Sequence, residues 1–282
     1  MKGGYFLLNG QFRKVGDFIF NLDDLTDRVN GFSETFRAGH NEVFFQQSVC
    51  SHLLTTAATI GMDLTGLIDP EGRLLRKDVS RLLNKNRYYL AAKVQIQVYP
   101  SNNKINILLE AQEIGRGYYP VGETGLILSF FTERKKEIQP FSNFAPAGLA
   151  FRQAAEREAA ELNKPNLILL NRNGFACESI GGSFAYIVGQ MVCFPAESSG
   201  GYSCSIKNEI RQSVQKAGFI PVEKEEISQE ELLSADEMFV FDACRGIQKV
   251  LGLEERRFYS TKTQQIAAQF TILAEQDRME KV

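Results

Sequence analysis

The chain of 282 residues can hold one large or two medium domains, and its 44% hydrophobic and 23% charged residues are typical of soluble globular proteins. A formal net charge of −2 lacks the basic excess with which proteins bind nucleic acid or anionic membranes, so neither partner is expected. The five cysteines form no CxxC pair and only two histidines are present, so we expect reduced thiols and no metal site.

The N-terminal segment contains no signal-peptide core, and no later apolar run reaches the length of a membrane span. A cytoplasmic location is therefore expected.

The first half of the chain alternates predicted hairpins and helices. Asn9 and Gly10 separate two apolar runs, a pair typical of a tight β-hairpin turn, and a second hairpin is expected over residues 36–45. In the segment 46–62, Val49, Leu53, Ala57 and Ile60 are spaced as one apolar face of a helix, and a shorter helix is expected over 77–83. Two long β-rich segments on either side of 101–103 predict a hairpin of long strands. This half is α+β.

A polar, charged stretch with two prolines, residues 132–146, predicts a domain boundary near residue 130, giving domains 1–130 and 131–282. An Ala-rich helix is expected over 147–162. Strands and helices then alternate, and Ser228 with Glu231 has the spacing of a helix capping box. The predicted strands cover 166–171, 175–179, 183–189, 190–195, 219–224 and 237–243, and the predicted helices cover 206–217, the segment after Ser228, and 263–276.

Three phrases, in this order along the chain, resemble segments of the class IV aminotransferases, the family of branched-chain aminotransferase and aminodeoxychorismate lyase. They are DDLTDRVNGFSETFRA followed by NEVFF, NLILLNRNGFACES, and LLSADEMFV. The resemblance implies the two-domain fold type IV of pyridoxal phosphate enzymes, with a small N-terminal α/β domain, a larger C-terminal pseudo-barrel domain and a homodimer. It also implies pyridoxal phosphate bound to a lysine as an aldimine.

The resemblance assigns Glu178 to the position beside the pyridine nitrogen of the cofactor, although a charged residue at a strand end is the alternative interpretation. Counting back without gaps from the strand at 166–171 places the family's lysine position at Ala145, and alanine cannot form an imine. No lysine occurs between Lys136 and Lys164, and both lie beyond a turn or helix from this position. A small alignment shift therefore restores no amine.

The phosphate contacts implied by the resemblance are altered as well. His52 replaces a helix arginine that would bind phosphate through a guanidinium fork, although it could instead be a partly buried helix histidine without a ligand. A helix start and a loop after the third phrase also lack the family's glycine, threonine and small hydroxyl residues; the residues there are Ser205, Ile206, Lys207 and Ala243. The sequence predicts a degenerate cofactor site.

These substitutions favour a pseudoenzyme or a repurposed small-anion binder. The alternative is an active pyridoxal phosphate aminotransferase or aminodeoxychorismate lyase with a relocated lysine, such as Lys207 or Lys249. A scaffold that binds a protein partner is a third hypothesis. Arg245 and Lys249 could form a carboxylate pocket or a solvated loop, and Cys204 near a helix start could be a reactive thiolate.

Overall fold

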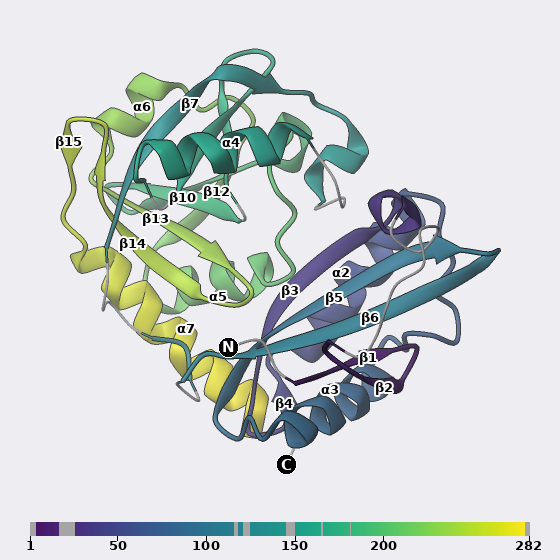
Figure 1. The fold of residues 1–282 in the computed structure, drawn as a ribbon. Coiled ribbons are helices and arrows are strands. Elements are labelled where there is room, and N and C mark those ends of the chain that lie inside the picture. The colour runs from purple at the N-terminus through teal and green to yellow at the C-terminus, as the bar shows by residue number, and fades with distance from the viewer. Residues whose placement is uncertain are drawn as a thin grey trace. The chain divides into compact units, whose positions relative to one another are not determined.

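The computed structural model describes residues 4–16, 26–115, 118–120, 125–144, 150–164, 166–180 and 182–279. Contacts divide the chain into two compact units (Figure 1). Unit 1 comprises Met1–Tyr119, Ala145–Gly148 and Ala274–Val282, and unit 2 comprises Pro120–Phe144 and Leu149–Leu273. Residue 130, the expected boundary, lies inside a strand of unit 2.

Unit 1 is built on a six-stranded antiparallel sheet with the order β2-β1-β6-β5-β3-β4. Its strands are β1 (Tyr5–Leu8), β2 (Gln11–Lys14), β3 (Phe32–Gly39), β4 (Glu42–Val43), β5 (Ala91–Ser101) and β6 (Lys104–Glu113). The first predicted hairpin is confirmed, because Asn9 (φ 51°) and Gly10 (φ 72°) adopt the positive φ values of a tight turn. The hairpin of the long strands β5 and β6 is confirmed too.

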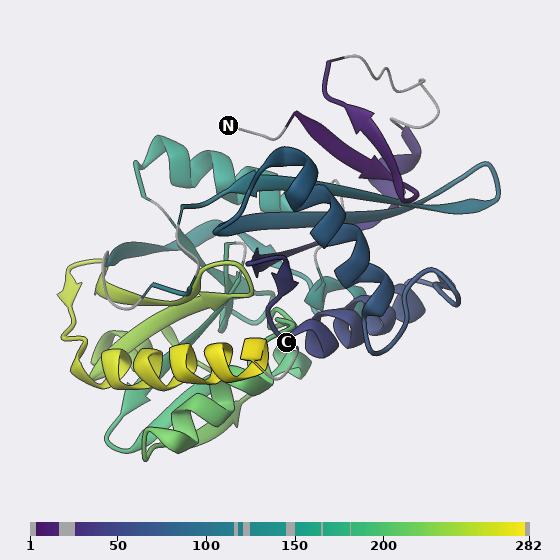
Figure 2. The same cartoon turned by 90° about the horizontal axis from the view of Figure 1, so that it is seen from below.

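Two helices, α2 (Gln46–Thr59) and α3 (Arg73–Asn86), cover one face of this sheet, and a 3-10 turn, η1 (Arg28–Asn30), precedes β3 (Figure 2). The helix expected over 77–83 is longer than predicted. The carboxylate of Asp69 accepts hydrogen bonds from the backbone N–H groups of Arg73 at 2.8 Å and Leu74 at 2.7 Å, so the helix starts one turn earlier. Phe6, Tyr99 and Leu108 pack together on the opposite face.

Unit 2 contains a nine-stranded sheet with the order β12-β11-β10-β13-β14-β7-β8-β9, and β15 pairs with β14. The strands are β7 (Leu126–Lys136), β8 (Leu167–Asn171), β9 (Ala176–Ser179), β10 (Ser183–Val188), β11 (Met191–Pro195), β12 (Ile220–Lys224), β13 (Glu237–Asp242), β14 (Gly246–Leu253) and β15 (Arg256–Arg257). β9 also lies beside β10 and β11, so the sheet curls back on itself. This curl gives unit 2 its barrel-like core.

The helices of unit 2 follow the sequence prediction closely. They are α4 (Ala150–Glu161), α5 (Lys207–Lys216) and α6 (Gln229–Ser234), with 3-10 turns η2 (Pro140–Asn143) and η3 (Glu197–Ser199). The last helix, α7 (Thr261–Met279), begins in unit 2, and its residues from Ala274 onward belong to unit 1. The predicted cap of α6 is confirmed, since the Ser228 hydroxyl accepts a 3.1 Å hydrogen bond from the Glu231 N–H. α4 packs Ala155 and Ala159 against Phe131 and Leu169. Within the described ranges, no helix is long and apolar enough to cross a membrane.

Two parts of unit 2 differ from the sequence prediction. Residues 132–136, expected in a linker, continue β7, which has a parallel neighbour on each side, β14 and β8. Residues 132–135 are exposed, but Lys136 at the end of the strand turns inward and is 3% exposed. β14 and β15 were not predicted, because glycines and charged residues interrupt their apolar pattern.

Candidate functional site

Glu178 lies on β9 opposite Leu169 of β8, and its side chain is only 2% exposed. The Lys136 ammonium, at the end of β7, contacts Oε2 of this carboxylate and donates a second hydrogen bond to the Gly200 carbonyl at 2.6 Å. The Lys136 side chain is 3% exposed, so both charges are removed from water. Loss of either partner would leave an uncompensated buried charge, so the pair is costly to break.

Arg152, on α4, brings a second cation to Glu178. Its Nη2 lies 3.5 Å from Oε1 of Glu178, and its guanidinium carbon is 5.5 Å from the centre of the Tyr202 ring. The Nε atom of Arg152 is buried and has no hydrogen-bond partner among the described residues. One carboxylate therefore faces two cations, which leaves an excess positive charge in this cluster.

The loop that accepts the Lys136 hydrogen bond is held tightly. The amide of Asn171 donates to the Ser199 carbonyl at 2.9 Å, and the Ser199 hydroxyl donates to the Ala196 carbonyl at 2.7 Å. A Cβ atom on Gly201 would approach the Ala196 carbonyl oxygen to 2.8 Å, so only glycine fits there. These contacts fix the position of the Gly200 carbonyl beside Lys136.

The start of α5 contains three of the predicted cofactor-binding residues, Ser205, Ile206 and Lys207, and all three are buried. Ile206 is the N-cap residue and provides no side-chain cap. The Lys207 ammonium lies 3.0 Å from Oε1 of Glu223 and 3.4 Å from the Pro195 carbonyl. The charge nearest to this helix start is therefore already paired.

Ala243 begins the turn between β13 and β14 and is buried. Asp242, which precedes it, accepts hydrogen bonds at Oδ1 from the N–H groups of Cys244 and Arg245, both at 2.8 Å. Its Oδ2 accepts a 2.6 Å hydrogen bond from Nε of Arg245. The expected carboxylate pocket at Arg245 is thus occupied by a carboxylate of the protein itself.

His52 lies on α2 of unit 1, with its side chain 9% exposed, and its Nδ1 is 3.1 Å from Oε2 of Glu34. Glu34 is on β3, in the register position opposite Ile96, and is 3% exposed. The predicted anion position therefore has a buried carboxylate as its neighbour.

The remaining residues named from the sequence are found as follows. Ala145 falls outside the described residues. Lys249 lies on β14 opposite Phe239, one strand beyond the turn that contains Ala243. All five cysteines are buried and lie outside any disulfide. Burial, together with the neighbouring Glu178 carboxylate, raises the pKa of Cys177 to about 12, so that thiol stays protonated. No group of three or more His, Cys, Asp or Glu side chains in the described ranges could hold a metal ion.

Sequence reasoning missed Lys136 and Arg152. Lys136 was expected on the far side of a turn, but the parallel pairing of β7 with β8 sets it opposite Asn171 and within reach of Glu178. The sequence pattern that could have indicated Lys136 is its place in the charged run 133–137.

The curled sheet of unit 2 and the antiparallel sheet of unit 1 define a known class of protein. The sequence model described as amino-transferase class IV matches residues 31–253. The chain therefore belongs to the class IV aminotransferase family, as its three sequence phrases predicted. No curated protein matches the chain in sequence.

Solved structures confirm the predicted fold. The chain is similar to a branched-chain aminotransferase from the archaeon Thermoproteus uzoniensis with norvaline, at 19% identity over 99% of this chain and 97% of that chain, with a TM-score of 0.83. A hypothetical aminotransferase from Mycobacterium tuberculosis in its PLP-bound form gives 12% identity, coverages of 96% and 98%, and a TM-score of 0.81. The branched-chain amino acid aminotransferase from Escherichia coli is 15% identical over 94% of this chain and 92% of that chain, with a TM-score of 0.80. At these identities the similarity shows the fold.

Proposed function

We propose that this class IV aminotransferase homologue is a pseudoenzyme, which keeps the family's fold without aldimine-based transamination. The observation that carries the proposal is the contact between Lys136 and Glu178. In the family pattern, the glutamate at this position stabilises a protonated pyridine nitrogen. Here a lysine ammonium already supplies that positive charge, and Arg152 adds another at 3.5 Å. A pyridinium would be a third cation beside one carboxylate.

The phosphate positions support the same proposal. A phosphate group carries up to two negative charges and needs cations or free N–H groups. His52 has the buried carboxylate of Glu34 beside it, the Lys207 ammonium is paired with Glu223, and Asp242 accepts from the N–H groups of its own turn. The residues at these positions therefore do not fit pyridoxal phosphate, and we derive no catalytic step through it.

The experiment tests for an internal aldimine. Purified protein is incubated with pyridoxal phosphate, its absorbance spectrum is recorded, and the sample is reduced with borohydride and mapped by peptide mass spectrometry. We expect no reducible adduct on the wild type. The matched variant Ala145→Lys restores an amine at the family position and controls for site access. An adduct on Lys207, Lys249 or Lys136 of the wild type, with transaminase turnover, would establish the relocated-lysine alternative instead.

A second candidate function is the binding of a small anion, and the excess charge at Arg152 favours it. Its buried Nε has no hydrogen-bond partner in the part of the chain that the structure describes, and an anion could accept from it without breaking the Lys136 contact. Phosphate added at constant ionic strength should raise the thermal midpoint of the wild type but not of Arg152→Gln. Equal shifts for the two proteins would exclude this site.

A homodimer in the cytoplasm completes the proposal. Family members assemble into oligomers, and buried cysteines outside any disulfide are compatible with a reducing compartment. Sedimentation equilibrium of the purified chain should give twice the 31.7 kDa mass of one chain. A monomer at micromolar concentration would contradict it.

A further inference from the structure

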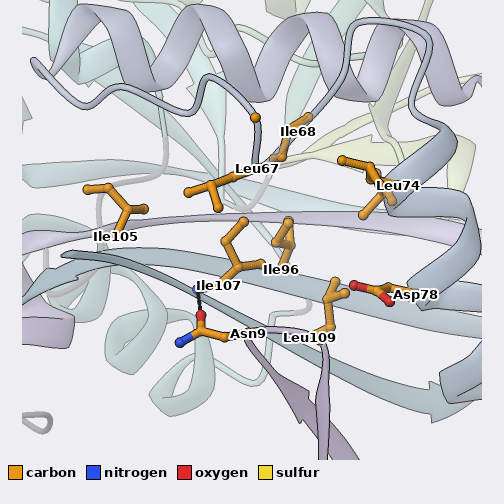
Figure 3. A pocket seen from close by; sticks show the side chains of 12 residues that line it. Asn9, Leu67, Ile68, Leu74, Asp78, Ile96, Ile105, Ile107 and Leu109 are labelled. Atoms are coloured by element: carbon orange, nitrogen blue, oxygen red, sulfur yellow. Dashed lines mark hydrogen bonds between the residues drawn. The ribbon is translucent and has the colours of Figure 1, made fainter.

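Unit 1 contains an apolar pocket whose lining includes none of the candidate cofactor residues described above. The pocket lies between the helix-covered face of the sheet, the start of α3 and the loop at residues 66–68, and its volume is about 240 Å³ (Figure 3). The side chains that define it are Ile68, Leu74, Ile96, Ile105, Ile107 and Leu109. Its floor is therefore formed by alternate residues of β6 together with Ile96 of β5.

The size and lining of this pocket suit a small apolar molecule. An engineered cavity of about 150 Å³ lined by Leu, Ile and Phe binds benzene, so the larger volume here accommodates roughly six to ten carbon atoms. Leu67 and Leu74 are 42% and 44% exposed at the rim, so a ligand can enter without unfolding of the sheet.

One carboxylate sets the chemistry at the mouth. Asp78 on α3 lines the pocket, and its Oδ1 accepts a 2.9 Å hydrogen bond from Nη1 of Arg81. No donor among the described residues is bonded to its Oδ2, which would lie 3.6 Å from a Cβ atom on Gly10. The other polar lining residue, Asn9, is already engaged, because its Oδ1 accepts from the Ile107 N–H at 2.8 Å and its Nδ2 donates to Asn106 at 2.7 Å.

The ion pair of Asp78 and Arg81 favours a ligand with an uncharged hydrogen-bond donor. Asp78 and Arg81 neutralise one another, so neither an ammonium nor a carboxylate on a ligand would gain a net counter-charge for the water it loses. A hydroxyl group can donate to Oδ2 of Asp78 while its alkyl part occupies the pocket. We infer that this pocket is a binding site for a small aliphatic alcohol, with the alkyl chain against Ile105, Ile107 and Leu109.

The test is a titration of the full chain with 1-hexanol, followed by the methyl resonances of isotope-labelled Ile and Leu residues. We expect saturable shifts at Ile105, Ile107 and Leu109, and at least tenfold weaker binding of hexylamine and hexanoate. Asp78→Ala should weaken hexanol binding about three- to tenfold, the range of one hydrogen bond. No saturable shift in the wild type, or tighter binding of either charged analogue, would overturn the inference.

A blocking variant provides the control. Leu74→Trp places an indole at the rim and should abolish the shifts, whereas Leu162→Trp, at a leucine 48% exposed in unit 2, should leave hexanol affinity unchanged. Hexanol affinity retained in a folded Leu74→Trp protein would also overturn the inference. Because no residue of the Glu178 cluster is changed, this result is independent of the proposed loss of cofactor chemistry.

Discussion

The charged cluster at Glu178 and the apolar pocket beneath α3 have opposite internal organisation. At Glu178, the protein fills a buried polar position with its own counter-charge from Lys136. In the pocket, an aliphatic lining encloses about 240 Å³ that no side chain fills. The difference indicates which ligand each place can accept, because a cation must displace Lys136 from Glu178 at the first place, whereas an apolar molecule displaces only water at the second.

Breaking the Lys136 contact should have the largest effect. Lys136→Met leaves the Glu178 carboxylate buried with only Arg152 at 3.5 Å, so we expect the free energy of unfolding to fall by about 3–5 kcal/mol. Urea denaturation followed by circular dichroism measures this change.

The neighbouring residue gives a matched control for that prediction. Lys135→Met removes an exposed ammonium from the same strand and should change stability by less than about 0.5 kcal/mol. If the free energy of unfolding falls equally little in both variants, Glu178 is not held by a buried ion pair.

Removal of the Asp242 carboxylate should have the next largest effect. Asp242→Ala leaves the N–H groups of Cys244 and Arg245 without their acceptor, and we expect a loss of about 1–3 kcal/mol in unfolding free energy. Glu226→Ala, at an exposed carboxylate, is the control. The same variant frees the turn for an external anion, so phosphate should protect Asp242→Ala from unfolding more than it protects the wild type.

The partly exposed ion pair of Lys224 and Glu231 should contribute less to the free energy of unfolding than the buried pair of Lys136 and Glu178. Burial opposes ionisation of Glu231, but hydrogen bonds from Lys224 and Tyr186 outweigh it and lower the pKa of this carboxyl below its ordinary value. Its stabilisation is thus complete above the unfolded pKa and is lost as the pH falls through the lower folded pKa. Glu231→Gln should cost no more than about 1 kcal/mol at pH 7, and the difference from wild type should shrink between about pH 5 and pH 3. A constant difference down to pH 3 would contradict the assignment.

The smallest effect is expected from filling the pocket. Ile105→Phe adds volume where space exists and should change the unfolding free energy by less than about 0.5 kcal/mol in either direction. Ile187→Phe, at a core residue with 0% exposure, should lose about 1–3 kcal/mol through overpacking. Similar losses in the two variants would show that the pocket is closed in solution.

Most of the fold could be predicted from the sequence because its local signals agree with the tertiary structure. The Asn9-Gly10 turn, the cap at Ser228 and the long hairpin of β5 and β6 each depend on residues that are close in sequence. The end of β7 could not be predicted, because its charged residues resemble a linker and only two parallel neighbours make them a strand. Parallel pairing connects segments far apart in the chain and has little local signal.

The sequence named candidate site residues but not their surroundings. The family resemblance pointed to Glu178, His52 and the start of α5 as cofactor positions, and that assignment stays a prediction. It gave no indication that a titratable side chain of the protein lies beside each of these positions, since Lys136, Glu34 and Glu223 are distant in sequence from the residues they contact. Contacts of this kind depend on the packing of distant segments rather than on any motif.

The carboxylate of Asp242 lies two and three residues along the chain from the turn N–H groups of Cys244 and Arg245 that it binds. Because it is tethered there, its effective concentration at those donors reaches the millimolar range or above, whatever the composition of the surrounding solution. A dissolved phosphate at lower concentration competes with an anion that never diffuses away. The turn N–H groups are therefore available to a dissolved anion only when that anion outcompetes the Asp242 carboxylate.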